Sequence, residues 1–373
     1  MSELPPRCYA IVTGGGTAGH VLPAMAIADA IVEAGHPAAA VHYVGSERGI
    51  EARIVPPTGY PMTLLPGRGI QRRLTTANLA AVWGLLVAMA RAVRLVRRLR
   101  PSVVVAVGGY ASVAVAFAAI VWRVPIVVAE QNAAPGAANR LIARFARASA
   151  VSFDGTPLPR AVVTGNPIRA EIAAIDPYRD RDRARAAFGV GEGRRLLLVF
   201  GGSLGALRIN RAVLDALPQW ADRDDLSIHH VIGTRDWEEL SKAVPADLGR
   251  LEYRAVPYED DMPAAFAAAD VAVCRSGSST CFELAAVGLP SVLVPSPVVT
   301  ADQQTRNARP LVEAGGAVLV PDAELDGPRL VAEVDGLLGD ASRHDNMSRA
   351  ALAWARPDAA AAIAALAADH ARG

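Results

Sequence analysis

"AIVTGGGTAGH" (residues 10–20) and "LLVFGGSLGA" (residues 197–206) are the two stretches that decide the fold. Each is a short apolar run followed by a glycine-rich loop and by residues that suit a helix. A strand, a loop and a helix in this order begin a doubly wound α/β domain, in which ligands bind beyond the carboxyl ends of the strands. Because the pattern occurs twice, nearly half the chain apart, we expect an α/β protein with two Rossmann-like domains. Their parallel sheets are expected to face a cleft.

Other β-branched runs alternate with helical stretches along the whole chain, as in parallel sheets. The predicted strands are residues 9–13, 41–44, 103–107, 126–129, 196–200, 229–232, 271–274 and 291–294. We place the domain boundary within "VTGNPIRAEI" (residues 163–172), so that residues 1–166 form the first domain and 167–345 the second. The alanine-rich helical segment from about 346 to 373 is expected to pack back on the first domain.

Composition excludes several classes of protein. The net charge of +1 gives no general attraction to nucleic acid. Lys242 is the only lysine, so the chain has no phosphate-binding loop of the Walker type. The three cysteines form no CxxC pair, which argues against a cysteine zinc site or a disulfide framework. Residues 1–7 show no signal peptide. The uncharged residues 103–122 are interpreted as a strand, a turn and a helix rather than as a membrane span.

The first glycine loop is suited to an oxygen-rich ligand. Glycine allows a close backbone approach, and the helix that follows offers unpaired N–H groups to a phosphate. Gly14-x-Gly16-x-x-Gly19 also fits the dinucleotide fingerprint, but the only acidic candidate behind the second strand, Glu47, comes late. A tight turn without a ligand is the alternative. His20 begins the helix, where the dipole favours a neutral ring. It could act as a general base or cap the turn.

A set of motifs in fixed order resembles one family of enzymes. The motifs are "GGGTAGHVLPAMAIADAI" (14–31), "GGYAS" (108–112), "EQNAAPGAANRL" (130–141), "GNPIR" (165–169), "GGSLGALRIN" (201–210), "CRSGSSTCFELAAVGLPSVLVP" (274–295) and "ADQQTRNA" (301–308). Together they resemble the N-acetylglucosaminyltransferases that convert lipid I into lipid II in peptidoglycan synthesis. The resemblance covers residues from about 9 to 320 and implies the GT-B fold.

The resemblance implies an inverting transfer of GlcNAc from UDP-GlcNAc to the C4 hydroxyl of MurNAc in undecaprenyl-linked lipid I. It implies no cofactor and no metal. It places the enzyme in the cytoplasm, peripherally on the inner face of the cell membrane, where other cell-wall synthesis proteins are possible partners. A GT-B glycosyltransferase acting on another lipid or on a natural-product acceptor is the alternative. An NAD-dependent oxidoreductase and a catalytically silent sugar-nucleotide binder are two further alternatives.

The family's functional residues map onto named positions of this chain. His20 matches the candidate base, with Glu130 as the second candidate. Positions matching the donor site are Thr17, Ala18, Gly19, Asn132, Arg169, Ser203, Glu259, Arg275, Ser278, Ser279, Thr280, Glu283, Gln303 and Gln304. Positions assigned to the acceptor side are Tyr110, Asn139 and Asn210.

Two glutamates and one acidic tripeptide allow more than one interpretation. Glu283 is suited to accept hydrogen bonds from the two ribose hydroxyls, although a solvated helix glutamate is the simpler interpretation. Glu259 stands where the family usually has an apolar residue. Asp180-Arg181-Asp182 matches the Asp-x-Asp pattern of metal-dependent transferases, but it lies in a charge run where acidic residues favour a helix start. We therefore predict no metal site.

Residues 75–101 are the candidate for membrane contact. Leu79, Trp83 and Leu86 share one helical face, and Arg91 and Arg94 follow at helical spacing. Apolar side chains with flanking arginines suit reversible attachment to an anionic lipid surface. The alternative is a helix packed on the first sheet with solvated arginines, and one helix can do both.

Overall fold

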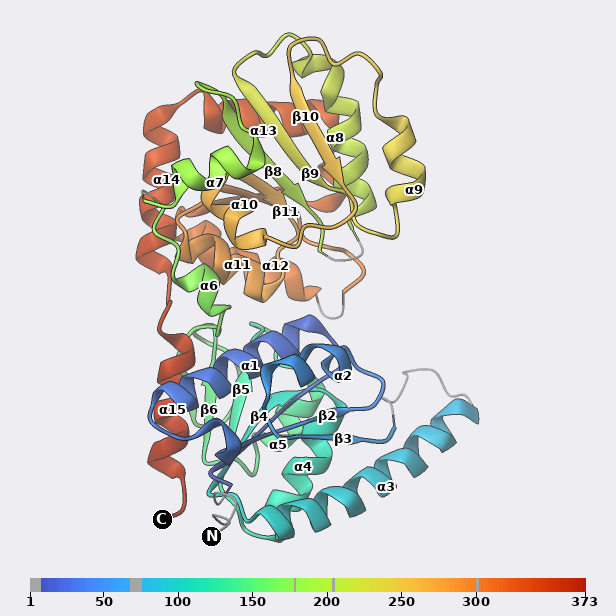
Figure 1. The fold of residues 1–373 in the computed structure, drawn as a ribbon, viewed down its shortest axis with the longest axis vertical. Coiled ribbons are helices and arrows are strands. Elements are labelled where there is room, and N and C mark those ends of the chain that lie inside the picture. The colour runs from blue at the N-terminus through green and yellow to red at the C-terminus, as the bar shows by residue number, and fades with distance from the viewer. Residues whose placement is uncertain (1–7, 68–75, 178, 203–204, 300–301) are drawn as a thin grey trace. The chain divides into compact units, whose positions relative to one another are not determined.

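The computed structural model describes residues 8–67, 76–177, 179–202, 205–299 and 302–373, with side chains of residues 76–82 excepted. The chain forms two compact units (Figure 1). The first comprises Met1–Arg169 and Arg356–Gly373, and the second comprises Ala170–Ala355. Short 3-10 turns lie at Ala38–Ala40, Pro56–Thr58, Ser241–Ala243 and Asp322–Glu324.

The first unit is built on a parallel sheet whose strand order, in the described residues, is β3-β2-β1-β4-β5-β6-β7. The strands are β1 (Ala10–Gly14), β2 (Val41–Ser46), β3 (Met62–Leu65), β4 (Val103–Gly108), β5 (Ile126–Glu130), β6 (Ala148–Val151) and β7 (Ala161–Val163). The helices are α1 (Ala18–Glu33), α2 (Glu51–Ile54), α3 (Thr76–Leu99), α4 (Tyr110–Val121), α5 (Ala137–Ile142) and α15 (Ala359–His370). The order reverses between β1 and β4, as in a Rossmann sheet.

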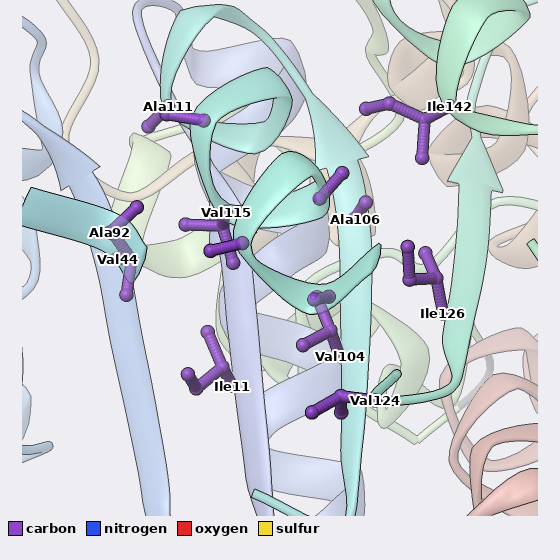
Figure 2. Packing of buried hydrophobic residues seen from close by; sticks show 14 of the residues in the cluster. Ile11, Val44, Ala92, Val104, Ala106, Ala111, Val115, Val124, Ile126 and Ile142 are labelled. Carbon is purple, nitrogen blue, oxygen red and sulfur yellow. The ribbon is translucent and has the colours of Figure 1, made fainter. Parts of the chain in front are cut away.

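The first sheet is buried on both faces because successive strand residues point to opposite sides. On β4, Val104 and Ala106 join the core that α3 and α4 cover. Figure 2 shows Val115 of α4 in this core and Ala92 of α3 beside Val44 of β2. Val105 of the same strand joins the opposite core, together with residues of α1 and α15. Because helices cover both faces of this strand, it needs apolar residues throughout, which explains the apolar run before Gly108-Gly109-Tyr110.

The uncharged residues 103–122 therefore form β4, a glycine turn and α4, as expected from the sequence. Within the part of the chain that the structure describes, no helix combines the length and the apolar character that crossing a membrane would require.

The second unit holds a parallel sheet of order β10-β9-β8-β11-β12-β13 in the described residues. Its strands are β8 (Arg195–Phe200), β9 (Leu226–Val231), β10 (Glu252–Val256), β11 (Val271–Cys274), β12 (Ser291–Leu293) and β13 (Ala317–Leu319). Its helices are α6 (Ala170–Ala173), α7 (Arg181–Phe188), α8 (Leu207–Trp220), α9 (Trp237–Leu240), α10 (Met262–Ala268), α11 (Ser278–Ala286), α12 (Gln303–Glu313), α13 (Gly327–Leu338) and α14 (Ala341–Trp354). The strand order reverses between β8 and β11, so this unit has the same type of sheet topology as the first.

The C-terminal segment returns to the first unit later than the sequence suggested. The expected domain boundary was residue 166 and the expected return began near 346, whereas the units divide after Arg169 and after Ala355. Helix α14 stays with the second unit because its Trp354 packs on Phe282 of α11, with ring centroids 4.6 Å apart. Only α15 packs on α1 and the first sheet, as Figure 1 shows.

Candidate active site

The carboxyl ends of β1 and β4 come together at the reversal of the first sheet. Gly14 ends β1, and the Tyr43 hydroxyl of β2 donates a 2.6 Å hydrogen bond to its carbonyl oxygen. Gly109 follows β4 with φ at +88°, and a Cβ there would lie 2.5 Å from the carbonyl oxygen of Gly15. The two loops therefore approach so closely that only glycine fits. This crevice is where a doubly wound sheet binds its ligand.

His20 lies at the third position of α1, inside this crevice. Its ring is half-buried, and Nδ1 lies 3.3 Å from Oγ1 of Thr17, the residue before the helix. A Cβ on Gly108 would lie 2.9 Å from Cδ2 of the ring and 3.0 Å from Nε2. The Nε2 edge of the imidazole thus rests against the backbone at the end of β4. The strand, loop and helix have placed the imidazole where the sequence indicated.

The surroundings of His20 favour a neutral ring. Burial lowers the pKa of His20 below its ordinary value of 6.5, while the negative charges of Glu130 and Glu51 and the acceptor carbonyl of Gly15 act in the opposite direction. The N-terminal end of α1 adds a partial positive charge that also disfavours imidazolium. A neutral imidazole at the edge of a ligand crevice is able to accept a proton from a hydroxyl group.

Glu130, the second candidate base, is engaged by the protein itself. It ends β5 and is buried. One carboxylate oxygen accepts from the backbone N–H of Asn132 at 2.9 Å and from its side chain at 3.2 Å. The other accepts from the Gly136 N–H at 3.0 Å and from Asn139 Nδ2 at 2.9 Å. With these donors in place, Glu130 shapes the loop after β5, and the geometry does not favour it as a base.

The acceptor-side candidates of the first unit have structural partners as well. Asn139 is buried, and its Nδ2 also donates to the carbonyls of Val107 and Ala129, at 3.3 and 3.2 Å. The Tyr110 hydroxyl donates to the Pro66 carbonyl at 3.1 Å, and burial raises the pKa of this tyrosine. Tyr110 therefore contacts the residue that directly follows β3, while Asn139 connects α5 to β4 and β5.

Glu51 is a site residue that the sequence reasoning missed. Its side chain is 0% exposed, and its carboxylate accepts from the Gly16 N–H at 3.0 Å and from the N–H and hydroxyl of Ser46 at 2.7 and 2.9 Å. Glu47, the acidic residue that was considered, instead lies on the surface 3.7 Å from Arg91. In the sequence, Glu51 is marked only by its place after β2 and near two glycines. Its contact with Gly16 could not be predicted, because the two residues are far apart in the chain.

The second glycine loop follows β8 at the corresponding reversal of the other sheet. Gly202 and Gly205 have φ of +85° and +82°, and α8 begins directly after the loop. Ser203 lies outside the described residues. Asn210, which was grouped with the acceptor side, lies in the second unit and is buried. Its side chain donates to the Ile232 carbonyl at 2.8 Å and contacts His230 Nε2 at 3.0 Å. It therefore supports the loop after β9, and its assignment to the acceptor side stays a prediction.

The segment predicted to bind the donor follows β11 and includes the start of α11. Arg275 directly follows β11. Its guanidinium donates hydrogen bonds to Asp322 at 2.5 Å and to the carbonyls of Val294 and Pro295 at 3.0 and 3.2 Å. Its charge is thus largely balanced within the protein, which reduces what it can offer to a diphosphate. The helix that follows has Gly277 as its N-cap.

Residues Ser278, Ser279 and Thr280 form the first turn of α11, at the end of the helix that carries the positive pole of its dipole. Glu283 follows one turn later and is only 7% exposed, so it is not the solvated glutamate of the simpler interpretation.

The first turn of α12 lies beside this segment. Gln303 begins the helix, and the Gln304 carbonyl accepts from the Ser276 hydroxyl at 3.0 Å. The side-chain oxygen of Gln304 accepts from the Ser296 N–H at 2.7 Å. These bonds bring the predicted glutamine pair next to the Ser-Gly-Ser-Ser-Thr turn.

Glu259 turns its carboxylate into the second unit. It lies 2.9 Å from Nε2 of the buried His229 and accepts from the Asp261 N–H at 2.9 Å, close to the start of α10. Any contact of Glu259 with a ligand would therefore come from its backbone. Arg169, also expected in the donor site, is half-buried at the last residue of the first unit's main segment.

The Asp-x-Asp pattern has a structural explanation. Arg181 and Arg185 of α7 and Arg195 of β8 all donate to the carboxylate of Asp270, which is buried, at 2.7, 3.2 and 2.9 Å. Asp180 accepts from the Asp176 N–H at 3.0 Å. The pattern thus starts a helix that is clamped to the sheet. Among the described residues, no group of three or more histidine, cysteine or acidic side chains is arranged to hold a metal ion.

Helix α3 packs into the first core on one side and exposes apolar and basic side chains on the other. Ala88, Ala92, Leu95 and Val96 are buried in the core under the first sheet. On the other side Trp83 is 69% exposed and Leu86 is 54% exposed, and Arg91 and Arg94 are exposed. The side chain of Leu79 lies outside the described residues. The neighbouring helix α4 adds the exposed apolar side chains Phe117, Ile120 and Val121.

Two doubly wound units, each with a glycine-rich loop at the reversal of its sheet, have the topology of the GT-B fold, the class to which many glycosyltransferases belong. Comparison with known proteins supports this class. Residues 10–151 match the glycosyltransferase family 28 N-terminal domain and residues 196–363 match the glycosyltransferase family 28 C-terminal domain. The crystal structure of Acinetobacter baumannii MurG aligns with a TM-score of 0.77 at 26% identity, covering 98% of this chain and 100% of that one.

Curated relatives narrow the family. A protein of Salinibacter ruber is 43% identical over 98% of this chain and 96% of its own length. One of Lactiplantibacillus plantarum is 38% identical over 94% of this chain and 96% of its own length. Both are called UDP-N-acetylglucosamine--N-acetylmuramyl-(pentapeptide) pyrophosphoryl-undecaprenol N-acetylglucosamine transferase. This chain belongs to the MurG family within glycosyltransferase family 28.

Proposed function

We propose that this chain transfers GlcNAc from UDP-GlcNAc to the C4 hydroxyl of MurNAc in undecaprenyl-linked lipid I, giving lipid II. Family membership supports the activity, since relatives over nearly the full length carry that name. The observation that carries the mechanism is the half-buried imidazole of His20 at the reversal point of the first sheet, with its Nε2 edge against Gly108.

The reaction is a single in-line displacement with inversion. His20 takes the proton of the acceptor hydroxyl as that oxygen attacks C1 of GlcNAc, while the bond from C1 to the UDP oxygen breaks. General-base catalysis of this kind contributes roughly 10²–10⁴ in rate. Thr17, Ala18 and Gly19, at the start of α1, place backbone amides beside the same crevice.

Departure of UDP requires stabilisation of its diphosphate charge. The N-terminal turns of α8 and α11 supply N–H donors and partial positive charge for this purpose. Arg275, already paired with Asp322, contributes little more. Because helix termini can replace a cation in this role, we propose that transfer needs no metal. Glu283, buried on α11, is the proposed acceptor for the ribose hydroxyls.

Replacement of His20 by alanine tests this mechanism. With UDP-GlcNAc and a short-chain lipid I analogue, His20→Ala should lower kcat at least about a hundredfold. UDP binding, measured by calorimetry, should persist. His36→Ala is the control, because this imidazole stacks on Tyr9 away from the crevice, and its kcat should match the wild type. Near-normal turnover of His20→Ala would remove this residue from the mechanism.

Attachment to a lipid surface is a second part of the proposal. Burial of Trp83 and Leu86 in lipid would contribute about 3–5 kcal/mol, and each arginine near anionic lipid about 1 kcal/mol more. Together with Arg91 and Arg94 this suits a peripheral enzyme on the inner face of the cell membrane. Sedimentation with anionic liposomes should drop sharply for the double variant Trp83→Glu, Leu86→Glu. Binding equal to the wild type would reject this surface.

A further inference from the structure

Glu51 is a buried carboxylate packed among glycines beneath the first glycine loop. A Cβ on Gly15, Gly45 or Gly49 would overlap the Glu51 side chain, so these glycines make room for it. The carboxylate accepts three hydrogen bonds, one from the Gly16 N–H and two from Ser46. In the described residues no arginine, lysine or histidine forms an ion pair with Glu51. Burial of a charge is costly unless it is hydrogen-bonded, and the three donors to Glu51 offset that cost.

The peptide unit between Gly15 and Gly16 links this carboxylate to His20. The N–H of that unit, on Gly16, donates to Glu51 at 3.0 Å. The C=O of the same unit, on Gly15, acts to raise the pKa of His20. The same oxygen lies where a Cβ on Gly109 would come within 2.5 Å, which places it in the crevice between β1 and β4. A trans peptide points its N–H and C=O in opposite directions, so fixing one fixes the other.

We propose that Glu51 is a positioning residue for transfer, which orients the Gly15–Gly16 peptide so that its carbonyl holds the His20 ring and which stabilises the imidazolium formed when His20 takes the acceptor proton. The arrangement is a carboxylate, a peptide and an imidazole in series. Through the peptide, Glu51 would orient the imidazole and stabilise the imidazolium, as a directly bonded aspartate does beside a catalytic histidine. The proposal rests on the role of His20 given above.

Two nearby negative charges favour the imidazolium form of His20. The charged groups that act on the His20 ring are Glu130 from the end of β5 and Glu51 from α2, and both favour imidazolium against the effect of burial. Glu130 is held by N–H donors from its own loop. Loss of the Glu51 charge should therefore make His20 a weaker base and shift the acid limb of kcat/KM to lower pH.

Glu51→Gln is the test, assayed for GlcNAc transfer to a soluble short-chain lipid I analogue between pH 5 and 9. The amide keeps the size of the side chain but removes its charge and one acceptor oxygen. We expect kcat to fall about tenfold to a hundredfold, with the acid limb at lower pH and UDP binding unchanged. Glu47→Gln is the control, since Glu47 lies on the surface beside Arg91, and it should change none of these.

Two further variants keep the outcome decisive. If Glu51→Gln melts below the assay temperature, Glu51→Asp keeps the charge but withdraws it from Gly16, and should lower kcat with little movement of the acid limb. In a His20→Ala background the Glu51 effect should vanish. Normal kcat and pH profile in folded Glu51→Gln, or normal kcat in Glu51→Asp, would overturn this inference alone. Normal turnover of His20→Ala would instead overturn the proposed mechanism.

Discussion

A methyl group on Gly108 should disable the enzyme through His20. The φ of Gly108 is +124°, which an alanine rarely adopts, and backbone strain of this kind costs about 1–3 kcal/mol. The new Cβ would lie 2.9 and 3.0 Å from two atoms of the imidazole. Carbon atoms prefer about 3.5–4.0 Å, so the ring must move by roughly 0.5–1 Å. A misplacement of about 1 Å can cost on the order of 10² in rate. Gly108→Ala should therefore lose about a hundredfold in kcat.

Gly155→Ala separates strain from displacement. Gly155 has φ of +70°, and a Cβ there would meet no atom within 4 Å. Both variants should lose some thermal stability, at about 2–4 °C per kcal/mol. Only Gly108→Ala should lose turnover, measured as UDP release with UDP-GlcNAc and a short-chain lipid I analogue. The double variant His20→Ala, Gly108→Ala should be no slower than His20→Ala, because the ring that the methyl displaces is gone. A kcat for Gly108→Ala within about twofold of the wild type, or additive losses in the double variant, would refute the reasoning.

Three other outcomes follow from the same contacts. Since burial holds the pKa of His20 below 6.5, the acid limb of kcat/KM should lie below that pH and disappear in His20→Ala; a limb above pH 6.5 would contradict this. Burial alone would raise the pKa of Asp270, but the Leu196 N–H and the arginines hold it below its ordinary value. Its stabilising effect is therefore present above pH about 4 and is lost as pH falls further. Asp270→Asn should cost about 3 kcal/mol in urea unfolding at pH 7, and unchanged unfolding would count against the clamp. The native protein should not react with a thiol reagent, because burial raises the pKa of every cysteine, whereas the denatured chain should react at all three: Cys8, Cys274 and Cys281.

Most buried strands could be predicted from the sequence, and the edge strands could not. Runs such as 103–107 and 196–200 are apolar at every position because helices cover both faces of the sheet. The strands that escaped prediction are β3, β6, β7, β10 and β13. All but β6 lie at the edges of their sheets. An edge strand such as β10, "EYRAV", carries charged side chains toward solvent and loses the continuous apolar signal.

The residues of the candidate site could likewise be predicted only where consecutive elements of the chain fix their position. His20 could be placed from the sequence because the strand, the glycine loop and the helix are consecutive, so local geometry fixes it. Glu51 could not, since its contact with Gly16 depends on β1 and β2 being neighbours in the sheet. Glu130 and Arg275 were expected to face ligands, but their internal donors and acceptors come from loops whose folding no motif reveals.

The most direct measurement of the central claim is the structure of the product. NMR spectroscopy should be applied to the disaccharide formed from UDP-GlcNAc and a short-chain lipid I analogue by the purified chain in the presence of a metal chelator. The account predicts a β-1,4-linked GlcNAc–MurNAc unit, one UDP released for each bond formed, and loss of both in His20→Ala. UDP release without a glycosidic bond, an α-linked product, or full turnover by His20→Ala would contradict it.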